Sequence, residues 1–505
     1  MHQVDIEKLT QSLARTLPAE LIETHISWVL LTADLAYKIK KPVKLPFVDY
    51  STLAARKHFC EEEVRLNRRL APSLYLGVSS ISSNNGNAGN TAQWGIDAPG
   101  TAVEYAVRMR RFDAGVLFSE QLAAGTLQAP SVDQLAALLA AFHRTAARAA
   151  ADGPFALPMH RQLGALAALN GAAAGATAPQ VQALKSWIHA QATDLGKLWQ
   201  QRKTEGWVRE CHGDLHLSNL VLHKGSVMAF DCIEFDPALR WIDVLDDAAF
   251  VMMDFSAHGR RDLAFRFVNA WLDATGDHGC LPALRFSAVY RALVRAQVSL
   301  LQPAGPENIP ATGYLQTALD WTPRAVPQLF ITCGLPGSGK TWRSQNLLES
   351  LGAIRIRSDV ERKRLFGLAM ADDSRALGVD LYTAQTSQRT YDSLFTKARE
   401  ALQAGFAVIL DAAFLRKAER TRAQALALEL GAAFAIVVCE APPAVLKVRL
   451  QARRGDASEA DIAVLKRLQP VAEPLTPDEL VLVHTGTFTN RPITPCPPAT
   501  DPAPI

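Results

Sequence analysis

Residues 328–342 form the run QLFITCGLPGSGKTW, the clearest structural signal in this chain of 505 residues. An apolar segment, 328–333, is followed at once by Gly334-Leu-Pro-Gly-Ser-Gly-Lys-Thr341 and then by a helical pattern. This is the GxxxxGK[ST] phosphate loop in the strand–loop–helix context that its chemistry requires. Its glycines let backbone N–H groups turn inward around phosphates, and the next helix presents its positive end to them. The run therefore predicts a nucleotide site.

Every functional position of this loop can be assigned from its pattern. The expected nucleotide-binding residues are Gly334, Gly337, Ser338, Gly339, Lys340 and Thr341. Lys340 would bridge the β- and γ-phosphate oxygens and so act in catalysis, and the Thr341 hydroxyl would ligate Mg²⁺. The alternative is a glycine-rich turn that matches by chance, and the flanking strand and helix argue against it.

Short apolar segments alternate with amphipathic helical patterns after residue 328. They are QLFITC, AIRIR, FAVIL, AFAIVV and ELVLV. This alternation is typical of an α/β domain with a doubly wound, mainly parallel sheet, which we expect over 328–487. Residues 303–327, rich in proline and glycine, are predicted to be a linker, and 488–505, with six prolines, a disordered tail.

Charged residues that follow these segments indicate that the site transfers a phosphoryl group as well as binding a nucleotide. Asp359 follows the second segment, where it could accept a proton from a substrate hydroxyl, cap the next helix, or do both. Arg362, one turn later, could hold an anionic substrate group. Asp411 ends the third segment, where we expect a Mg²⁺-linked carboxylate. Arg449 and Arg453, spaced i and i+4, could close over the phosphates, unless they form only a solvated helix face.

These residues resemble the small P-loop kinases that include the kinase domain of phage polynucleotide kinase and the zeta-toxin-like kinases. The resemblance covers about 327–484 and rests on GLPGSGKT, RSDVER, the LDAAF strand end and the arginine run. It implies that Asp359 is the general base, Arg362 a substrate contact, and Arg449 and Arg453 lid arginines. It does not carry the substrate over. The strand-end Asp is followed here by two alanines where polynucleotide kinases have a Thr-Asn pair, which weakens a nucleic-acid interpretation.

The first half of the chain carries a second phosphotransfer motif, CHGDLHLSNLVLHKGSVMAFD, at residues 211–231. Asp214 and Asn219 are five residues apart, and Asp231 ends the second of two short apolar segments. A base, a Mg²⁺-binding amide and a Mg²⁺-binding carboxylate at this spacing match the catalytic core of protein-kinase-like folds. The form HGDLHLSN resembles the aminoglycoside phosphotransferase and choline-kinase branch, over about residues 20–300.

This second resemblance implies the remaining contacts to ATP. Lys38, in LAYK, is placed where the strand lysine of that fold belongs, so it would touch the α- and β-phosphates with Glu63 as its ion-pair partner. Lys40 and Glu62 are near enough in sequence to take either of these two roles instead. Met109 falls near the hinge that would hold adenine.

The pattern of residues 1–302 predicts an α+β, two-lobed domain of the protein-kinase-like type. Strand-like segments dominate 20–112, and Ala-rich helical patterns dominate 113–302. Asp243, in RWIDVLDD, resembles the carboxylate that steadies the catalytic loop. No GxGxxG run separates the first two strand-like segments, so a degenerate, non-catalytic lobe stays open as an alternative.

Composition excludes several other classes of protein. The net charge of +3 argues against nucleic-acid binding by the charge of the whole protein, but it leaves a local basic groove open. Seven scattered cysteines without a CxxC pair suggest neither a zinc site nor a disulfide framework. No apolar window is long enough to span a membrane, and the polar N-terminus is unlike a signal peptide, so we expect a cytoplasmic protein.

Together these patterns predict an ATP-dependent kinase with two sites, each transferring the γ-phosphoryl group of Mg·ATP to a hydroxyl of a small-molecule acceptor. They indicate no protein partner and no membrane. One alternative is an ATP-binding regulatory protein in which one or both sites do not transfer. Another is a P-loop site that acts on the 5′-hydroxyl ends of nucleic acids, which the basic residues 355–364 favour and the scarcity of nearby aromatic residues does not.

Overall fold

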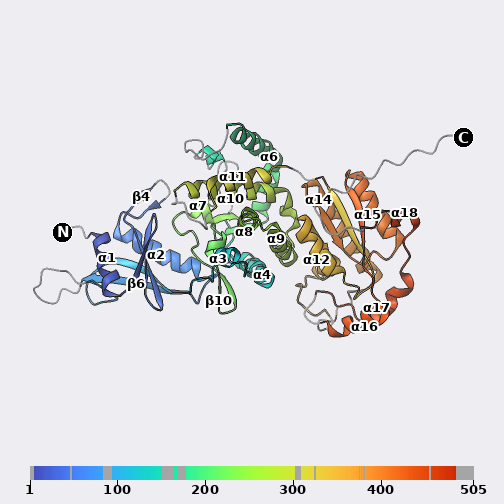
Figure 1. The fold of residues 1–505 in the computed structure, drawn as a ribbon, viewed down its shortest axis with the longest axis horizontal. Helices are drawn as coiled ribbons and strands as arrows, with labels where there is room; N and C mark the ends of the chain where they lie inside the picture. The colour runs from blue at the N-terminus through green and yellow to red at the C-terminus, as the bar shows by residue number, and fades with distance from the viewer. Residues whose placement is uncertain are drawn as a thin grey trace, which may run out of the picture. The chain divides into compact units, whose positions relative to one another are not determined.

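A computed structural model of the chain provides the fold (Figure 1). It describes residues 5–45, 48–83, 94–150, 158, 163–164, 166–167, 178–301, 309–323, 326–374, 376, 378, 381–453 and 457–484. The predicted tail, 488–505, lies outside these residues. The chain divides into two compact units, one made of 1–157 and 197–251 and the other of 158–196 and 252–505. Among the described helices, none is long and apolar enough to cross a membrane.

The first unit is built on a six-stranded antiparallel sheet, which matches the strand-rich character predicted for its sequence. The strand order is β1-β2-β3-β8-β6-β7. The strands are β1 (Glu20–Glu23), β2 (Ser27–Leu31), β3 (Leu35–Lys40), β6 (Tyr75–Ser83), β7 (Trp94–Ile96) and β8 (Ala102–Arg110). Helix α1 (Ile6–Thr16) buries Leu9 and Leu13 in a core cluster with residues of the sheet. Helix α2 (Leu53–Asn67) packs on β6 and β8 and brings its glutamates to β3.

The remaining elements of this unit are short strands and helices. They are β4 (Lys44–Leu45), β5 (Val48–Asp49), α3 (Phe118–Ala123), α4 (Ala129–Thr145), β9 (Val208–Glu210), η1 (Leu217–Asn219), β10 (Leu220–His223), β11 (Ser226–Ala229), α7 (Pro237–Arg240) and β12 (Trp241–Asp243). Helices α6 (Ala178–Thr204) and α8 (Val244–Ala257) complete this part of the chain.

The β10–β11 hairpin positions two of the predicted site residues. Its turn residues, Lys224 and Gly225, have φ angles of 51° and 77°, as a two-residue type I′ turn requires. Asn219 precedes the first strand and Asp231 follows the second, and the N–H of Phe230 donates to the carbonyl of Asn219 at 3.0 Å. The hairpin therefore brings the predicted amide and carboxylate to the same end.

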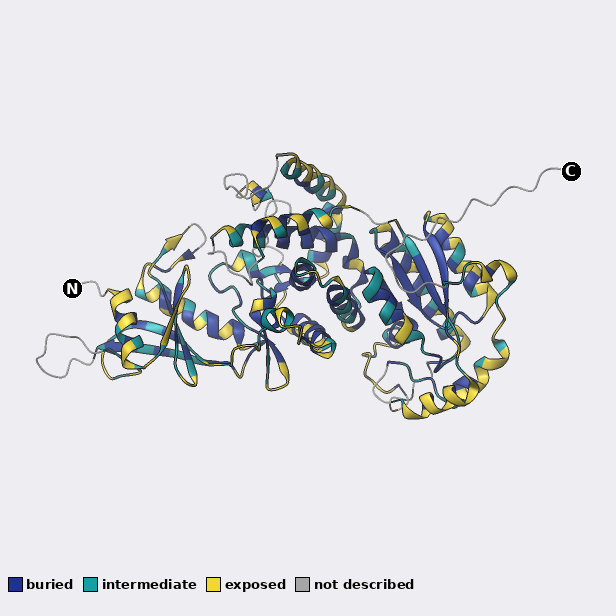
Figure 2. Cartoon of the chain, in the orientation of Figure 1, coloured by how far each residue is buried: buried dark blue, intermediate teal, exposed yellow. Residues whose placement is uncertain are grey.

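The second unit contains a parallel sheet in the order β14-β15-β13-β16, so the predicted parallel sheet is confirmed. Its strands are β13 (Gln328–Cys333), β14 (Ile354–Arg357), β15 (Val408–Asp411) and β16 (Ala433–Val438). These strands are almost wholly buried (Figure 2), which explains why their sequences are nearly continuous apolar runs. The doubly wound arrangement of the helices stays a prediction.

The helices of this unit precede, connect or follow these strands in the chain. They are α9 (Arg261–Thr275), η2 (His278–Cys280), α10 (Leu281–Leu301), α11 (Ala311–Asp320), α12 (Lys340–Leu351), α13 (Ser358–Arg364), α14 (Ala384–Gln403), α15 (Lys417–Glu429), α16 (Pro443–Ala452), α17 (Ile462–Leu468), η3 (Gln469–Val471) and α18 (Pro477–Leu480).

Two sequence predictions for this unit need correction. The fifth apolar segment, ELVLV, forms no full strand: its start lies in α18, because Thr476 caps a helix that Pro477 begins. The predicted linker, 303–327, contains α11, whose Tyr314 is buried and donates a hydrogen bond to Asp254 Oδ1 at 2.9 Å. The described part of that segment is thus mainly a packed helix.

Candidate active sites

Three charged side chains meet at the first candidate site. Lys38, on β3, places its Nζ 3.0 Å from Glu63 Oε1 on α2 and 2.5 Å from Asp231 Oδ1 after β11. The Glu63 side chain is fully buried, whereas 44% of the Asp231 side chain is exposed. Burial opposes the negative charge of Glu63, but Lys38 and Lys40 outweigh it and lower its pKa to about 2. Lys38 thus lies between a buried carboxylate, Glu63, and a partly exposed one, Asp231.

The structure distinguishes the neighbours that the sequence left open. Lys40 lies on the same face of β3 as Lys38, but it is fully enclosed, with Nζ 2.6 Å from Glu63 Oε2 and in contact with Glu234. Glu62 instead pairs with Arg65 at 2.8 Å. Lys38 is therefore the lysine of β3 beside the open carboxylate, and Glu63, not Glu62, is its partner.

The predicted catalytic loop is assembled around Asp214. Asn219 Nδ2 donates to the backbone carbonyl of Asp214 at 2.9 Å and to its Oδ2 at 3.3 Å. This leaves the carbonyl oxygen of Asn219 for a cation. His216 Nε2 lies 3.5 Å from Asp214 Oδ2. Asp214 and Asn219, predicted from their spacing, are thus in direct contact.

His212 and Gly213, the two residues that precede Asp214, determine the shape of this loop. Burial lowers the pKa of His212, whose Nδ1 faces the N–H of Asp214 at 3.2 Å and whose Nε2 faces the carbonyl of Phe230 at 3.0 Å. These partners suit a neutral ring that accepts at Nδ1 and donates at Nε2. Gly213 has a φ of 89°, and a Cβ there would lie 2.7 Å from the carbonyl oxygen of Leu239. Only glycine fits this position without moving backbone.

Asp247, on α8, accepts hydrogen bonds from the backbone of this loop. This role was not predicted from the sequence. The Asp247 carboxylate accepts the N–H of His212 at 2.8 Å and the N–H of Gly213 at 2.9 Å. Asp243, which resemblance suggested for this task, instead binds Arg202 at 2.7 Å. That prediction was wrong because RWIDVLDD offers three aspartates in a short span, and only the turn from β12 into α8 selects one.

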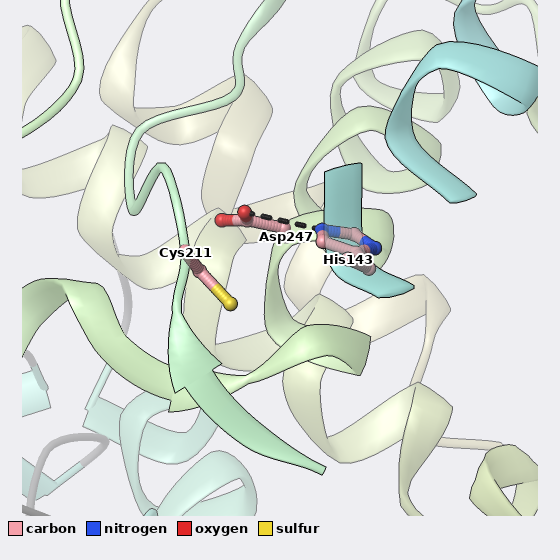
Figure 3. Close-up of side chains that lie close together, drawn as sticks. All are labelled: His143, Cys211 and Asp247. Atoms are coloured by element: carbon pink, nitrogen blue, oxygen red, sulfur yellow. Dashed lines mark hydrogen bonds and ion pairs between the residues drawn. The ribbon is translucent and has the colours of Figure 1, made fainter. Parts of the chain in front are cut away.

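Asp247 also belongs to a buried group with His143 and Cys211 (Figure 3). His143 Nε2 lies 3.4 Å from Asp247 Oδ2, and the three possible ligand atoms lie within 4.8 Å of one another. Burial, followed by the charge of Asp247, raises the pKa of the Cys211 thiol well above its usual range. Because the Asp247 oxygens already accept two backbone N–H groups, this group is better explained as a hydrogen-bonded brace than as a metal centre.

Met109 lies on β8, opposite Ala36 of β3 and Tyr75 of β6. It packs against a core cluster that includes Tyr75 and Val107. The structure thus places this predicted adenine contact within the sheet that carries Lys38, and its role stays a prediction.

The second candidate site begins with the phosphate loop. Gly337 and Gly339 have φ angles of 83° and 96°, and Gly339 caps α12. A Cβ at Gly334 would lie 2.1 Å from the carbonyl oxygen of Cys439, so this position also requires glycine. Lys340 Nζ donates to the carbonyls of Gly334 and Leu335, each at 3.0 Å. Burial lowers the Lys340 pKa.

One further atom of this loop points to a ligand. The Ser338 hydroxyl is buried and has no hydrogen-bond partner among the described residues. A buried hydroxyl without a partner is costly, and a phosphate oxygen would satisfy it. The loop therefore fits the nucleotide that its sequence predicts.

Asp411, at the end of β15, is buried beside the loop. Ser344 Oγ lies 3.0 Å from its Oδ2, and Thr332 Oγ1 lies 3.5 Å from its Oδ1. Thr341 and Asp411 line the same cavity and offer only oxygen atoms, which are the ligands that Mg²⁺ prefers. The donor set thus fits the predicted magnesium.

Asp359 and Arg362 also line this cavity. Arg362 Nη1 lies 2.8 Å from Asp359 Oδ1, and its guanidinium lies 4.9 Å from the ring centroid of Tyr382. Burial opposes the charge of Asp359, but Arg362 and other neighbours outweigh it, so the pKa of Asp359 lies below its usual value. An ionised carboxylate at this position is able to accept a proton.

The predicted lid arginines also reach the cavity. Arg449, on α16, donates from Nη1 to the carbonyl of Gly337 at 3.2 Å, and Arg453 also lines the cavity. The cavity has a volume of about 1380 Å³. Sequence reasoning had not assigned a function to several of its other lining residues, among them Arg343, Arg416, Arg422 and Arg467. Arginine is frequent in this part of the sequence, but only the fold shows which arginines line the cavity.

Comparison with known proteins identifies the two halves. Residues 93–286 match a family described as a phosphotransferase enzyme family, and 329–475 match one described as an AAA domain. Proteins of Mycobacterium bovis and Mycobacterium tuberculosis, described as uncharacterized, are 30% identical over 456 residues, which cover 88% of this chain and 88% of theirs. The chain belongs to their family. In this chain, a phosphotransferase-type domain thus precedes a P-loop domain, so both predicted resemblances are confirmed at the level of domain type.

Solved structures are also similar to parts of this family member. A choline kinase from Cryptosporidium parvum is 12% identical, with a TM-score of 0.39, and the match covers 63% of this chain and 95% of that one. A sugar kinase from a Janibacter species is 21% identical, with a TM-score of 0.24, and the match covers 30% and 82%.

Proposed function

We propose that the chain is an ATP-dependent phosphotransferase with two sites, each moving the γ-phosphoryl group of ATP to a hydroxyl of a small-molecule acceptor. The observation that carries this proposal is the cavity of the second unit. It is lined together by the phosphate loop with Lys340, by Asp411, and by the Asp359–Arg362 pair. A phosphate cradle, a cation ligand and a candidate base thus share one space, as phosphoryl transfer requires.

The residues of the second site have separate tasks in this reaction. Backbone N–H groups of the loop hold the phosphates, and Lys340 exchanges the carbonyls of Gly334 and Leu335 for phosphate oxygens. Thr341 and Asp411 are the residues that would hold Mg²⁺, which supplies charge neutralisation on the phosphates when bound. Asp359 accepts the proton of the acceptor hydroxyl, and Arg362 keeps this carboxylate ionised and oriented.

The arginines of α16 add charge stabilisation. Arg449 contacts the carbonyl of Gly337, within the phosphate loop. A guanidinium at this distance needs only a side-chain rotation to reach a phosphate oxygen. Arg449 and Arg453 would thereby stabilise the charge that spreads over the transferred group.

The first site would run the same chemistry with other residues. Glu63 anchors Lys38, which would leave Asp231 and bind the α- and β-phosphates. Asp231 and the carbonyl oxygen of Asn219 would then hold the cation, and Asp214 would accept the acceptor proton. The contact between Asn219 and Asp214 keeps the base and the cation ligand in register.

The near-neutral charge of the chain favours small acceptors over nucleic acid at both sites. We place the first site in a functional domain of residues 1–302, the second in 328–487, and the whole protein in the cytoplasm.

Transfer of labelled γ-phosphate tests this proposal. Wild type, Asp214→Asn and Lys340→Ala would be incubated with Mg·ATP and a panel of aminoglycosides, choline, sugars, nucleosides and 5′-hydroxyl oligonucleotides. We expect label on small acceptors, with each variant losing a different product. Label on oligonucleotides alone would contradict the small-molecule proposal, and ATP binding without transfer to any acceptor would support the regulatory alternative.

A further inference from the structure

A helix from outside the P-loop domain contributes to the P-loop sheet. Helix α9 lies in the stretch matched by the phosphotransferase family, and β14 lies in the stretch matched by the AAA domain. The Asn269 side chain on α9 donates from Nδ2 to the carbonyl of Ala353 at 2.9 Å and accepts the N–H of Arg355 at 2.6 Å. Since β14 is an edge strand, Asn269 completes its backbone hydrogen bonding from one side.

One helical turn further along α9, Asp273 meets the side chains of the same strand. Its Oδ2 lies 3.6 Å from Arg355 Nη2 and 3.8 Å from Arg357 Nη1. A third arginine, Arg364 on α13, donates from Nη2 to the backbone carbonyl of Asp273 at 2.8 Å. The side chains of Asp273, Arg355 and Arg357 are all buried. Asp273 is therefore the anion against which two buried guanidinium groups of β14 are placed.

Both arginines lead to the nucleotide cavity. Arg355 Nη1 donates to Ser344 Oγ at 3.4 Å, and Ser344 Oγ lies 3.0 Å from the carboxylate of Asp411. Arg357 lines the cavity itself, two residues before Asp359. Arg355 thus links α9, through Ser344, to the proposed cation ligand Asp411, and Arg357 links α9 to the cavity wall.

We propose that Asp273 is a positioning residue of the P-loop site, holding Arg355 and Arg357 so that Asp411 stays available to the cation. This inference rests on the proposed function of that site. Its physical basis is the cost of a buried guanidinium without a counter-ion, which forces a rearrangement when its anion is removed. Through Ser344 Oγ, Arg355 is also linked to the carboxylate of Asp411. Without Asp273, Arg355 would turn toward Asp411 and compete with the bound cation.

The consequence is specific to magnesium and not to the nucleotide in general. The phosphate loop and Lys340 have no described contact with Asp273, so ATP binding without Mg²⁺ should be unchanged by its loss. The gain in ATP affinity that Mg²⁺ confers should fall, because that gain depends on Asp411. A merely structural role for Asp273 would weaken both forms of binding alike.

Calorimetric titration of ATP, with and without Mg²⁺, tests this assignment on the full chain. The parent protein carries Lys38→Met to silence the first site. In Asp273→Asn, we expect the affinity for ATP alone to match the parent, while the gain from Mg²⁺ falls about fivefold to tenfold, as for residues coupled in one network. The control is Glu349→Gln. It removes an ion pair of 2.8 Å between Glu349 and Arg266, which lies on α9 like Asp273, and it should change neither value.

A second variant keeps the test sharp if Asp273→Asn is poorly folded. In Asp273→Asn/Arg355→Met, the freed charge is gone, and we expect most of the gain from Mg²⁺ to return. An unchanged Mg²⁺ response in Asp273→Asn, or no recovery in the double variant, would overturn the inference. If the parent bound no ATP at all, the proposed function of the P-loop site would itself fail, which is a distinct result.

Discussion

Replacing Lys40 by Met tests how the two lysines of β3 divide their tasks. Lys40 is wholly enclosed, with Nζ 2.6 Å from Glu63 and in contact with Glu234, and neither glutamate is appreciably exposed. Burial opposes the charge of Lys40, but Glu234 and Glu63 outweigh it and raise its pKa. Lys38 shares Glu63 but turns toward the half-open Asp231. We therefore expect Lys40 to serve stability and Lys38 to serve the nucleotide.

The magnitude follows from what each substitution leaves behind. Without Lys40, Glu63 keeps Lys38, but Glu234 loses its ion pair and keeps the Tyr50 hydroxyl, at 2.5 Å, as a donor. Breaking a buried ion pair in this way costs about 3–5 kcal/mol. Without Lys38, Lys40 still neutralises Glu63, and Asp231 is open to water, so the cost is about 1 kcal/mol.

Urea unfolding of the full chain, followed by tryptophan fluorescence, measures these costs, and ATP titration measures function. For the transition in which the first unit unfolds, we expect Lys40→Met to lower the free energy of unfolding by about 2 kcal/mol or more beyond the loss caused by Lys38→Met. Lys38→Met should lose ATP binding at the first site while staying folded. Lys44→Met, which removes an exposed pair with Asp49, is the control. Equal destabilisation by Lys40→Met and Lys38→Met, or a Lys40→Met variant as stable as the control, would refute this reasoning.

Two further predictions concern the second unit. Gly334→Ala places a Cβ 2.1 Å from the carbonyl oxygen of Cys439, so the phosphate loop must shift, and ATP titration of this variant should show that only the second site is lost. Unimpaired binding at both sites would mean that the loop relaxes freely. Burial lowers the pKa of His278 to about 3, below its value in the unfolded chain. The unfolded state therefore takes up the proton first, and stability should fall between about pH 6 and pH 5 by about 1 kcal/mol. Unfolding curves at both pH values should show this loss in wild type and its absence in His278→Gln; equal slopes would contradict it.

Local patterns predicted the parts of both sites that lie close together in the chain. The phosphate loop is fixed by its own glycines and by the strand and helix that flank it. Asn219 and Asp231 could be paired because the short turn at Lys224 and Gly225 closes the hairpin between them. In each case a few consecutive residues determine the backbone.

The contacts that sequence reasoning missed depend on packing between distant segments. RWIDVLDD contains three aspartates, and only the position of α8 selects Asp247 over Asp243. Tyr314 lies among prolines that favour a linker, yet its burial against α10 makes a helix stable there. Asp273 is far from β14 in sequence, and no local pattern could link it to Arg355. The rest of the sites therefore required the tertiary structure.

Two nucleotide sites in one chain form the centre of this proposal, and counting bound ATP tests them most directly. Equilibrium dialysis with labelled Mg·ATP would be carried out on wild type, Lys38→Met and Lys340→Ala. We expect two nucleotides per wild-type chain and one per chain in each variant, because each lysine serves its own site. A wild-type chain that binds a single nucleotide, or two variants that both retain two, would contradict the assignment.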